Sequence, residues 1–124
     1  MFKKKNNTIK HSRQEALAAI PIINRSVMVE ELEGGDLLVT YPVTLRPILM
    51  KLSRYLGKAP QTTYRKLQLD RLGTSVWIFL DGQHSVGQII KKFAESHSLH
   101  PKEAEVSVTQ FLQALGQRGI IGLR

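Results

Sequence analysis

The C-terminal half of the chain, residues 64–124, carries a succession of patterns that strongly limits the fold. Alternating apolar and polar residues over 64–69 predict a strand with one buried face. Three helical patterns follow, at 70–80, 85–97 and 101–118, and in each of them apolar residues recur every three or four positions. A strand that leads into three short helices predicts an α+β fold with a winged-helix or helix-turn-helix-like unit.

Capping and stop residues mark the ends of these helices. Asp70 offers a side-chain oxygen to the free amides of the first helix, and Ser85 with Gln88 forms a capping box for the second. Pro101 fits the first turn of the third helix, and Gly119 ends it. The residues expected in the core are Leu72, Val76, Trp77 and Leu80, then Val86, Ile89, Ile90, Phe93 and Ala94, and finally Ala104, Val108, Phe111, Leu112 and Leu115.

The N-terminal half predicts the rest of a sheet. Two β-prone runs, 27–32 and 37–41, flank a Gly-Gly turn and predict a hairpin. A hairpin alone is marginally stable, so we expect the strand at 64–69 to complete a three-stranded antiparallel sheet. Pro21 favours extended backbone at 20–23, and the apolar segment 120–123 is expected to lie against the core.

Residues 42–63 separate the second and third predicted strands, and they predict an extra amphipathic helix that begins near Thr44 and ends at Gly57. Three interpretations remain open. The helix covers the core and keeps a solvated basic face, or it lies on an anionic membrane surface, or it contacts a peptide or nucleic acid. Its apolar residues are Leu45, Ile48, Leu49, Leu52 and Leu56, and its basic residues are Arg46, Lys51, Arg54 and Lys58.

The net charge of +8 favours acidic partners, and the charge is concentrated in two places. Residues 1–13 carry five Lys or Arg and no acid, and the stretch between Asp36 and Asp70 carries six and no acid. Residues 1–19 predict a flexible basic tail with at most one helical turn near Gln14–Ala19. A cleaved signal peptide is not expected there, because polar residues separate the basic region from the apolar one.

Several kinds of chemistry are excluded or disfavoured. Cysteine is absent, which excludes disulfides, thiolate catalysis and cysteine-ligated zinc and is compatible with a reducing cytoplasm. No Gly-rich phosphate loop is present, and no apolar run approaches the roughly 18 residues of a membrane span. The four histidines are not arranged with carboxylates as in a metal site. We therefore expect no catalytic residues, no metal and no cofactor. These histidines are His11, His84, His97 and His100.

The succession of motifs resembles the PqqD family over residues 20–124. The resemblance implies a three-stranded sheet followed by three helices, with residues 42–63 as an insertion where many members have a short turn. A subgroup with a basic insertion before the third strand is the nearest match. The resembling features are Ile20-Pro21 with Asn24, Leu69-Asp70, Gly73, Val76-Trp77, Leu80-Asp81-Gly82, Ser85-Val86, Ile89-Ile90, Glu105-Val106, Phe111-Leu112, Leu115 and Gly119-Ile120-Ile121.

The resemblance also implies a function. Family members act as peptide chaperones: they bind the leader segment of a ribosomally made precursor peptide, which a radical or other peptide-modifying enzyme then modifies. The leader adds as a strand to the free edge of the third strand, in a groove against the third helix. Arg65 and Lys66 would favour an acidic peptide. Carried over to this chain, the peptide-binding residues are Tyr64, Arg65, Lys66, Leu67, Gln68 and Leu69 on the strand, and Val106, Gln110, Gln113 and Gln117 on the helix.

Alternative interpretations stay open beside this one. Lys66 is also the kind of residue that protects an exposed strand edge from aggregation, and the glutamines also fit an ordinary solvated helix face. A basic winged-helix module that binds nucleic acid or an anionic membrane surface is the second functional hypothesis. Glu103 and Glu105 at the start of the third helix argue against major-groove reading. The chain is expected to be a monomer, or a homodimer paired through its free strand edge.

Overall fold

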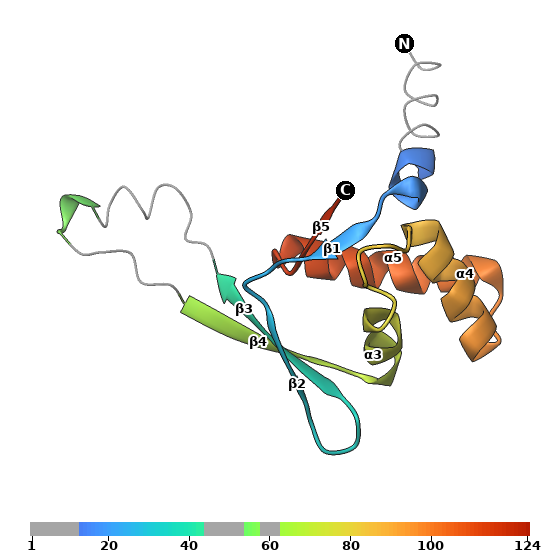
Figure 1. Cartoon of the computed structure of the whole chain (residues 1–124), viewed down its shortest axis with the longest axis horizontal. Helices are drawn as coiled ribbons and strands as arrows, with labels where there is room; N and C mark the ends of the chain where they lie inside the picture. The colour runs from blue at the N-terminus through green and yellow to red at the C-terminus, as the bar shows by residue number, and fades with distance from the viewer. Residues whose placement is uncertain (1–12, 44–53, 58–62) are drawn as a thin grey trace, which may run out of the picture.

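The computed structural model has an α+β fold in which an antiparallel sheet lies to one side of a group of helices (Figure 1). It describes residues 13–43, 54–57 and 63–124. The winged-helix character expected from the sequence stays a prediction. The three helices that follow the sheet are α3 (Arg71–Trp77), α4 (Val86–His97) and α5 (Pro101–Gln117).

The predicted three-stranded antiparallel sheet is confirmed. Its strands are β2 (Met28–Glu31), β3 (Leu37–Val43) and β4 (Thr63–Leu69), in the order β2-β3-β4. Gly34 and Gly35 turn the β2–β3 hairpin with φ angles of 90° and 91°, a conformation that favours glycine.

One face of this sheet packs on the helices. Val39 and Tyr41 of β3 point to that face and are buried, and their direct partners in β4 are Leu67 and Arg65. The opposite face is more open, and Tyr64 there is 54% exposed. The alternation of β3 therefore follows the pattern expected from the sequence.

A second, two-stranded ribbon joins the start and the end of the domain. β1 (Pro21–Ile23) pairs antiparallel with β5 (Ile121–Leu123), and Figure 1 shows the two side by side next to α5. Two further hydrogen bonds of 2.9 Å, between Ile20 and Arg124, extend the ladder. The sequence indicated extended backbone at one end and an apolar segment at the other, but not their pairing.

Local capping chemistry sets the helix starts as predicted. Asp70 Oδ1 accepts a hydrogen bond from Gly73 N at 2.8 Å, and Ser85 and Gln88 form the reciprocal capping box of α4. His100 is an additional cap, because its Nδ1 accepts from the amide of Lys102 at 3.1 Å.

Two details of α3 differ from the prediction. The helix ends at Trp77, not Leu80, because residues 78–80 continue as tight turns in which Leu80 N donates to Trp77 O. Leu72 was expected in the core and is 49% exposed. Gly73, Val76 and Trp77 set the buried side of this short helix, and Leu72 lies roughly 90° from the centre of that side.

The core lies between the helices and the inner face of the sheet. Apart from Leu72, the helical residues predicted for the core are buried or, for Ala94 and Phe111, partly buried against it. The buried apolar residues are Val39, Tyr41, Leu69, Val76, Trp77, Leu80, Val86, Ile89, Ile90, Phe93, Ala104, Val108, Leu112, Leu115, Ile120 and Ile121.

The helical turn predicted near Gln14–Ala19 is present at residues 13–18, and this segment contacts the domain although it was expected to be flexible. Arg13 forms a 2.7 Å ion pair with Glu105, and Leu17 packs against the core. The tail prediction for 1–12 lies outside the described residues. The predicted helix of the insertion 42–63 also lies outside them, apart from the exposed residues 54–57.

Two glycines provide a matched test of the packing between α3 and α5. A Cβ built on Gly73 lies 2.9 Å from Cε2 of Phe111, whereas a Cβ on Gly116 meets nothing within 4 Å. We expect Gly73→Ala to lower the free energy of unfolding by about 1–2 kcal/mol, because the aromatic ring must move. Gly116→Ala should raise it by about 0.5–1 kcal/mol, since alanine is the better helix former. Urea unfolding measures both, and equal effects would contradict the close approach of the two helices.

The hydrogen bonds in the loop after α3 lead us to expect that the stability of the fold depends on pH. The hydrogen bond from the His84 ring, followed by that from the Gln83 amide, lowers the pKa of Asp81 from 3.8 to about 2. A pKa that is depressed in the folded state means that the ionised carboxylate stabilises the fold above pH 3.8, and that this stabilisation is lost as the pH falls through 2. A carbon-detected NMR titration should give a midpoint near 2 for Asp81. A midpoint at the ordinary value would contradict the loop geometry, and Asp81→Asn is the control that should abolish this step.

Candidate functional site

The candidate site is the outer edge of β4. β4 pairs with β3 on one side, and no strand among the described residues pairs with its other side. The strand begins one residue before the predicted start, at Thr63, and most of its residues are exposed, with Leu67 half-buried and Leu69 buried. An unpaired edge presents a row of free main-chain donors and acceptors.

The hairpin register shows which residues face this free edge. Leu32 N donates to Asp36 O at 2.8 Å, so Asp36 turns its main-chain groups toward the β2 side. Main-chain groups alternate along an antiparallel strand, so the odd-numbered residues of β3 bond to their odd-numbered partners in β4. The N–H and C=O groups of Tyr64, Lys66 and Gln68 therefore point to the free edge.

The side chains of β4 divide between the two faces of the sheet. Arg65 lies on the inner face with Leu67 and Leu69, beside the helices. Lys66 lies on the outer face, since successive residues point to opposite sides. The two basic residues that the sequence grouped together thus face different surroundings.

A pocket of about 360 Å³ lies where Arg65 meets the C-terminal end of α5. Tyr41 and Val43 of β3 form one side, and residues 116–119 form the other. Arg118 Nη1 donates a 2.7 Å hydrogen bond to the hydroxyl of Tyr41, whose side chain is only 3% exposed. This pocket brings together two of the predicted site residues, Arg65 from the strand and Gln117 from the helix.

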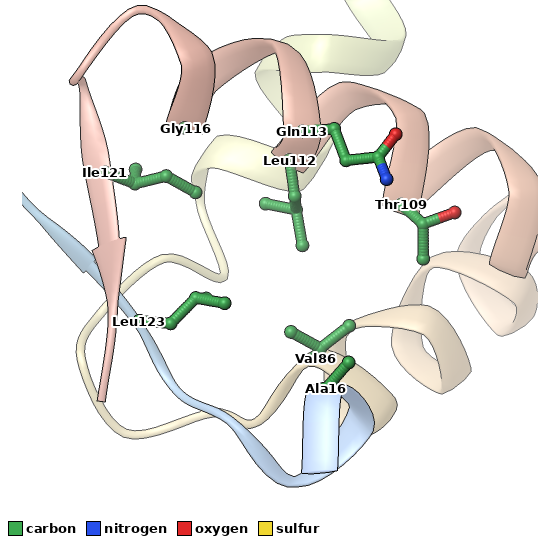
Figure 2. A pocket seen from close by; sticks show the side chains of 8 residues that line it. All are labelled: Ala16, Val86, Thr109, Leu112, Gln113, Gly116, Ile121 and Leu123. Carbon is green, nitrogen blue, oxygen red and sulfur yellow. The ribbon is translucent and has the colours of Figure 1, made fainter. Parts of the chain in front are cut away.

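The other three predicted helix residues, Val106, Gln110 and Gln113, do not line this pocket. Val106, Gln110, Gln113 and Gln117 are exposed and share the face of α5 opposite its buried stripe. Gln113 lines a separate apolar cavity of about 290 Å³, where the side chains of Leu112, Val86 and Leu123 point into the space (Figure 2). Val106 and Gln110 line neither cavity. The groove role proposed for these four residues stays a prediction.

Two residues of the pocket were missed by the sequence analysis. Tyr41 was considered only as a strand residue, and Arg118 only as the last residue of the third helix and as one of its polar residues that could contact nucleic acid. The position of Arg118 directly before Gly119 could have indicated a role at the sheet, because the last side chain before a helix end lies where the chain turns back toward the sheet. The contact joins positions 77 residues apart, so only the fold reveals it.

The structure shows the surroundings of two of the histidines that were considered as metal ligands. His97 lies against Phe93, with ring centroids 4.6 Å apart, and His100 caps α5. Across the described ranges, no group of three or more histidine or acidic side chains is placed to hold a metal ion. Nor does any helix in the described part of the chain have the length and apolarity needed to cross a membrane.

Comparison with known proteins finds a family match. The model of the family described as Coenzyme PQQ synthesis protein D (PqqD) matches residues 59–121. This span is just over half of the chain and covers β4, α3, α4 and α5. No curated protein and no solved structure matches the chain. The family match and the strand followed by three helices together show that this chain belongs to the PqqD family.

Proposed function

We propose that this protein is a non-catalytic peptide-binding protein that recognises the leader segment of a ribosomally made precursor peptide and presents it to a modifying enzyme. The observation that carries the proposal is an edge of β4 that no other strand in the described part of the chain covers, in a chain of the PqqD family. The family's description, coenzyme PQQ synthesis, supports a role in the biosynthesis of a cofactor or natural product.

Strand addition accounts for the affinity. A peptide laid along β4 finds the free N–H and C=O groups of Tyr64, Lys66 and Gln68, which bind main chain and not a particular sequence. Side chains on the two faces of the sheet then supply specificity. No covalent or proton-transfer step is needed, so the chemistry would belong to the partner enzyme, whether a radical enzyme or another peptide-modifying enzyme.

The second hypothesis, a basic module that binds nucleic acid or an anionic membrane, depends on the charges of 1–13 and 42–63. These segments lie largely outside the described residues, so no geometry favours it here. The salt dependence of binding distinguishes the two hypotheses. Binding through phosphate contacts weakens steeply as the salt concentration rises, while binding through main-chain pairing weakens less.

Backbone NMR of the labelled full chain tests the proposal. The probes are synthetic leader segments of short precursor chains encoded beside this gene, titrated at low and moderate salt. We expect chemical-shift changes concentrated in 64–69 that survive moderate salt. The control is the same peptide with N-methyl groups at alternate positions, which should not bind in the methylated register because pairing needs its N–H groups. Shifts confined to the basic segments and lost with salt would instead support electrostatic docking.

A further inference from the structure

The pocket at the end of α5 has the composition of an anion site. Its lining includes two basic residues, Arg65 and Arg118, and no acidic residue. Within the described ranges, no hydrogen bond or ion pair engages the Arg65 side chain. A positive pocket without an internal counter-charge has the electrostatics to attract an acidic group.

Tyr41 gives this pocket a fixed donor arrangement. Its hydroxyl accepts the hydrogen bond from Arg118 Nη1, so its own proton remains for another acceptor. The guanidinium carbon of Arg118 also lies 6.0 Å from the Tyr41 ring centroid, at the outer limit of a cation–π contact. Arg65 is the direct cross-strand partner of Tyr41, so its side chain starts beside the same ring.

We propose that this pocket binds the carboxylate of one Asp or Glu side chain of a peptide lying along β4. The proposal rests on the proposed function, because it assigns the carboxylate to a peptide added at that edge. A carboxylate matches the planar fork of arginine and would also accept the Tyr41 proton. The pocket would thus recognise an acidic residue at one position of the peptide, whereas Lys66 on the other face would only attract acidic peptides in general.

The register of β4 extends the inference to a sequence pattern. Side chains of an added strand that face the helices lie opposite Arg65 and Leu67 in turn. The acidic residue should therefore be followed or preceded, two positions away, by an apolar residue against the half-buried Leu67. The direction of the peptide decides which of the two orders occurs.

A minimal probe tests the pocket apart from strand addition. N-acetyl-glutamate N-methylamide and its glutamine counterpart are titrated into the full chain at constant ionic strength, with the Arg Nε–Hε signals and the amides of 116–119 observed by NMR. We expect saturable shifts with the glutamate probe, none with the glutamine probe, and loss of the effect in Arg118→Gln. Equal responses to both probes, or no response to either, would overturn the carboxylate site.

A peptide that binds β4 provides the second test. Replacing the acidic residues of the peptide one at a time by the corresponding amide should weaken binding to the original protein at least about tenfold at one position. The same replacement should weaken binding to the Arg118→Gln or Arg65→Gln protein less than about twofold, because the partner of the carboxylate is already missing. Arg71→Gln is the matched control, because Arg71 is exposed on α3 and does not line the pocket. A flat response to all acid-to-amide changes overturns this proposal and leaves strand addition standing.

Different NMR signals test the proposed strand addition and the proposed carboxylate pocket, so the failure of one can be told from the failure of the other. If the glutamate probe binds in the pocket but no peptide shifts the amides of 64–69, the proposed function fails, and with it the assignment of the carboxylate to a strand-added peptide. If an oligonucleotide displaces the glutamate probe more strongly than any peptide at equal ionic strength, the pocket is a phosphate site, and the proposal is overturned as well.

Discussion

Replacing Lys66 by proline is expected to lower the affinity for the leader peptide about tenfold to a hundredfold while the sheet stays folded. The Lys66 amide faces the free edge, so proline removes a donor from the peptide and places its ring in the peptide's path. It breaks no bond to β3, and proline is tolerated on the open side of an edge strand. Isothermal titration with the peptide measures the loss, and urea unfolding checks the fold.

Two matched variants separate the causes. Lys66→Thr removes the charge and keeps the amide, so binding should fall only a few-fold, and the difference from the original protein should shrink at higher salt. Leu67→Pro removes an amide that faces β3, so it should destabilise the domain by about 3 kcal/mol. If the Lys66→Pro protein is folded and binds the peptide as well as the original chain, strand addition at this edge is wrong.

Phe93→Ala is expected to lower the free energy of unfolding by about 3–5 kcal/mol. The Phe93 side chain is 1% exposed and lies in α4 within the helical part of the core. Its removal costs the transfer energy of the ring and leaves a cavity that close-packed neighbours fill only partly. Urea unfolding followed by circular dichroism gives the difference, which is a large part of the roughly 5–15 kcal/mol typical of a domain.

Ile78→Ala is the control for this prediction. Ile78 is also a large apolar residue, but it is 70% exposed in the turn after α3. Its truncation should change the free energy of unfolding by no more than about 0.5 kcal/mol. Equal losses for the Phe93 and Ile78 variants would contradict the arrangement of the core.

Many parts of the fold that were predicted correctly depend on neighbouring residues. The Asp70 cap, the Ser85 capping box and the Gly-Gly hairpin each involve groups within a few positions, so a local pattern is enough to identify them. The pairing of β1 with β5 joins the two ends of the domain, and extended apolar segments alone do not specify a partner. Leu72 was misplaced because a helix of two turns leaves its periodicity poorly defined.

The candidate site divides in the same way. The alternation of β4 was enough to predict a strand with exposed positions, whereas its free edge was an expectation taken from the resemblance to the PqqD family. The pocket could not be predicted from the sequence. It depends on the strand register that places Arg65 beside Tyr41, and on the contact between the end of α5 and Tyr41. An apolar stripe identifies which side of a helix is buried, but not which flank meets the strand.

Amide hydrogen exchange along β4 tests the central claim most directly. In the free protein, the amides of Tyr64, Lys66 and Gln68 should exchange fast, because they face the open edge, while those of Arg65 and Leu67 are protected by β3. A bound leader peptide should slow exchange at the three edge amides and change the other two little. Edge amides that keep exchanging fast under saturating peptide would contradict strand addition at β4.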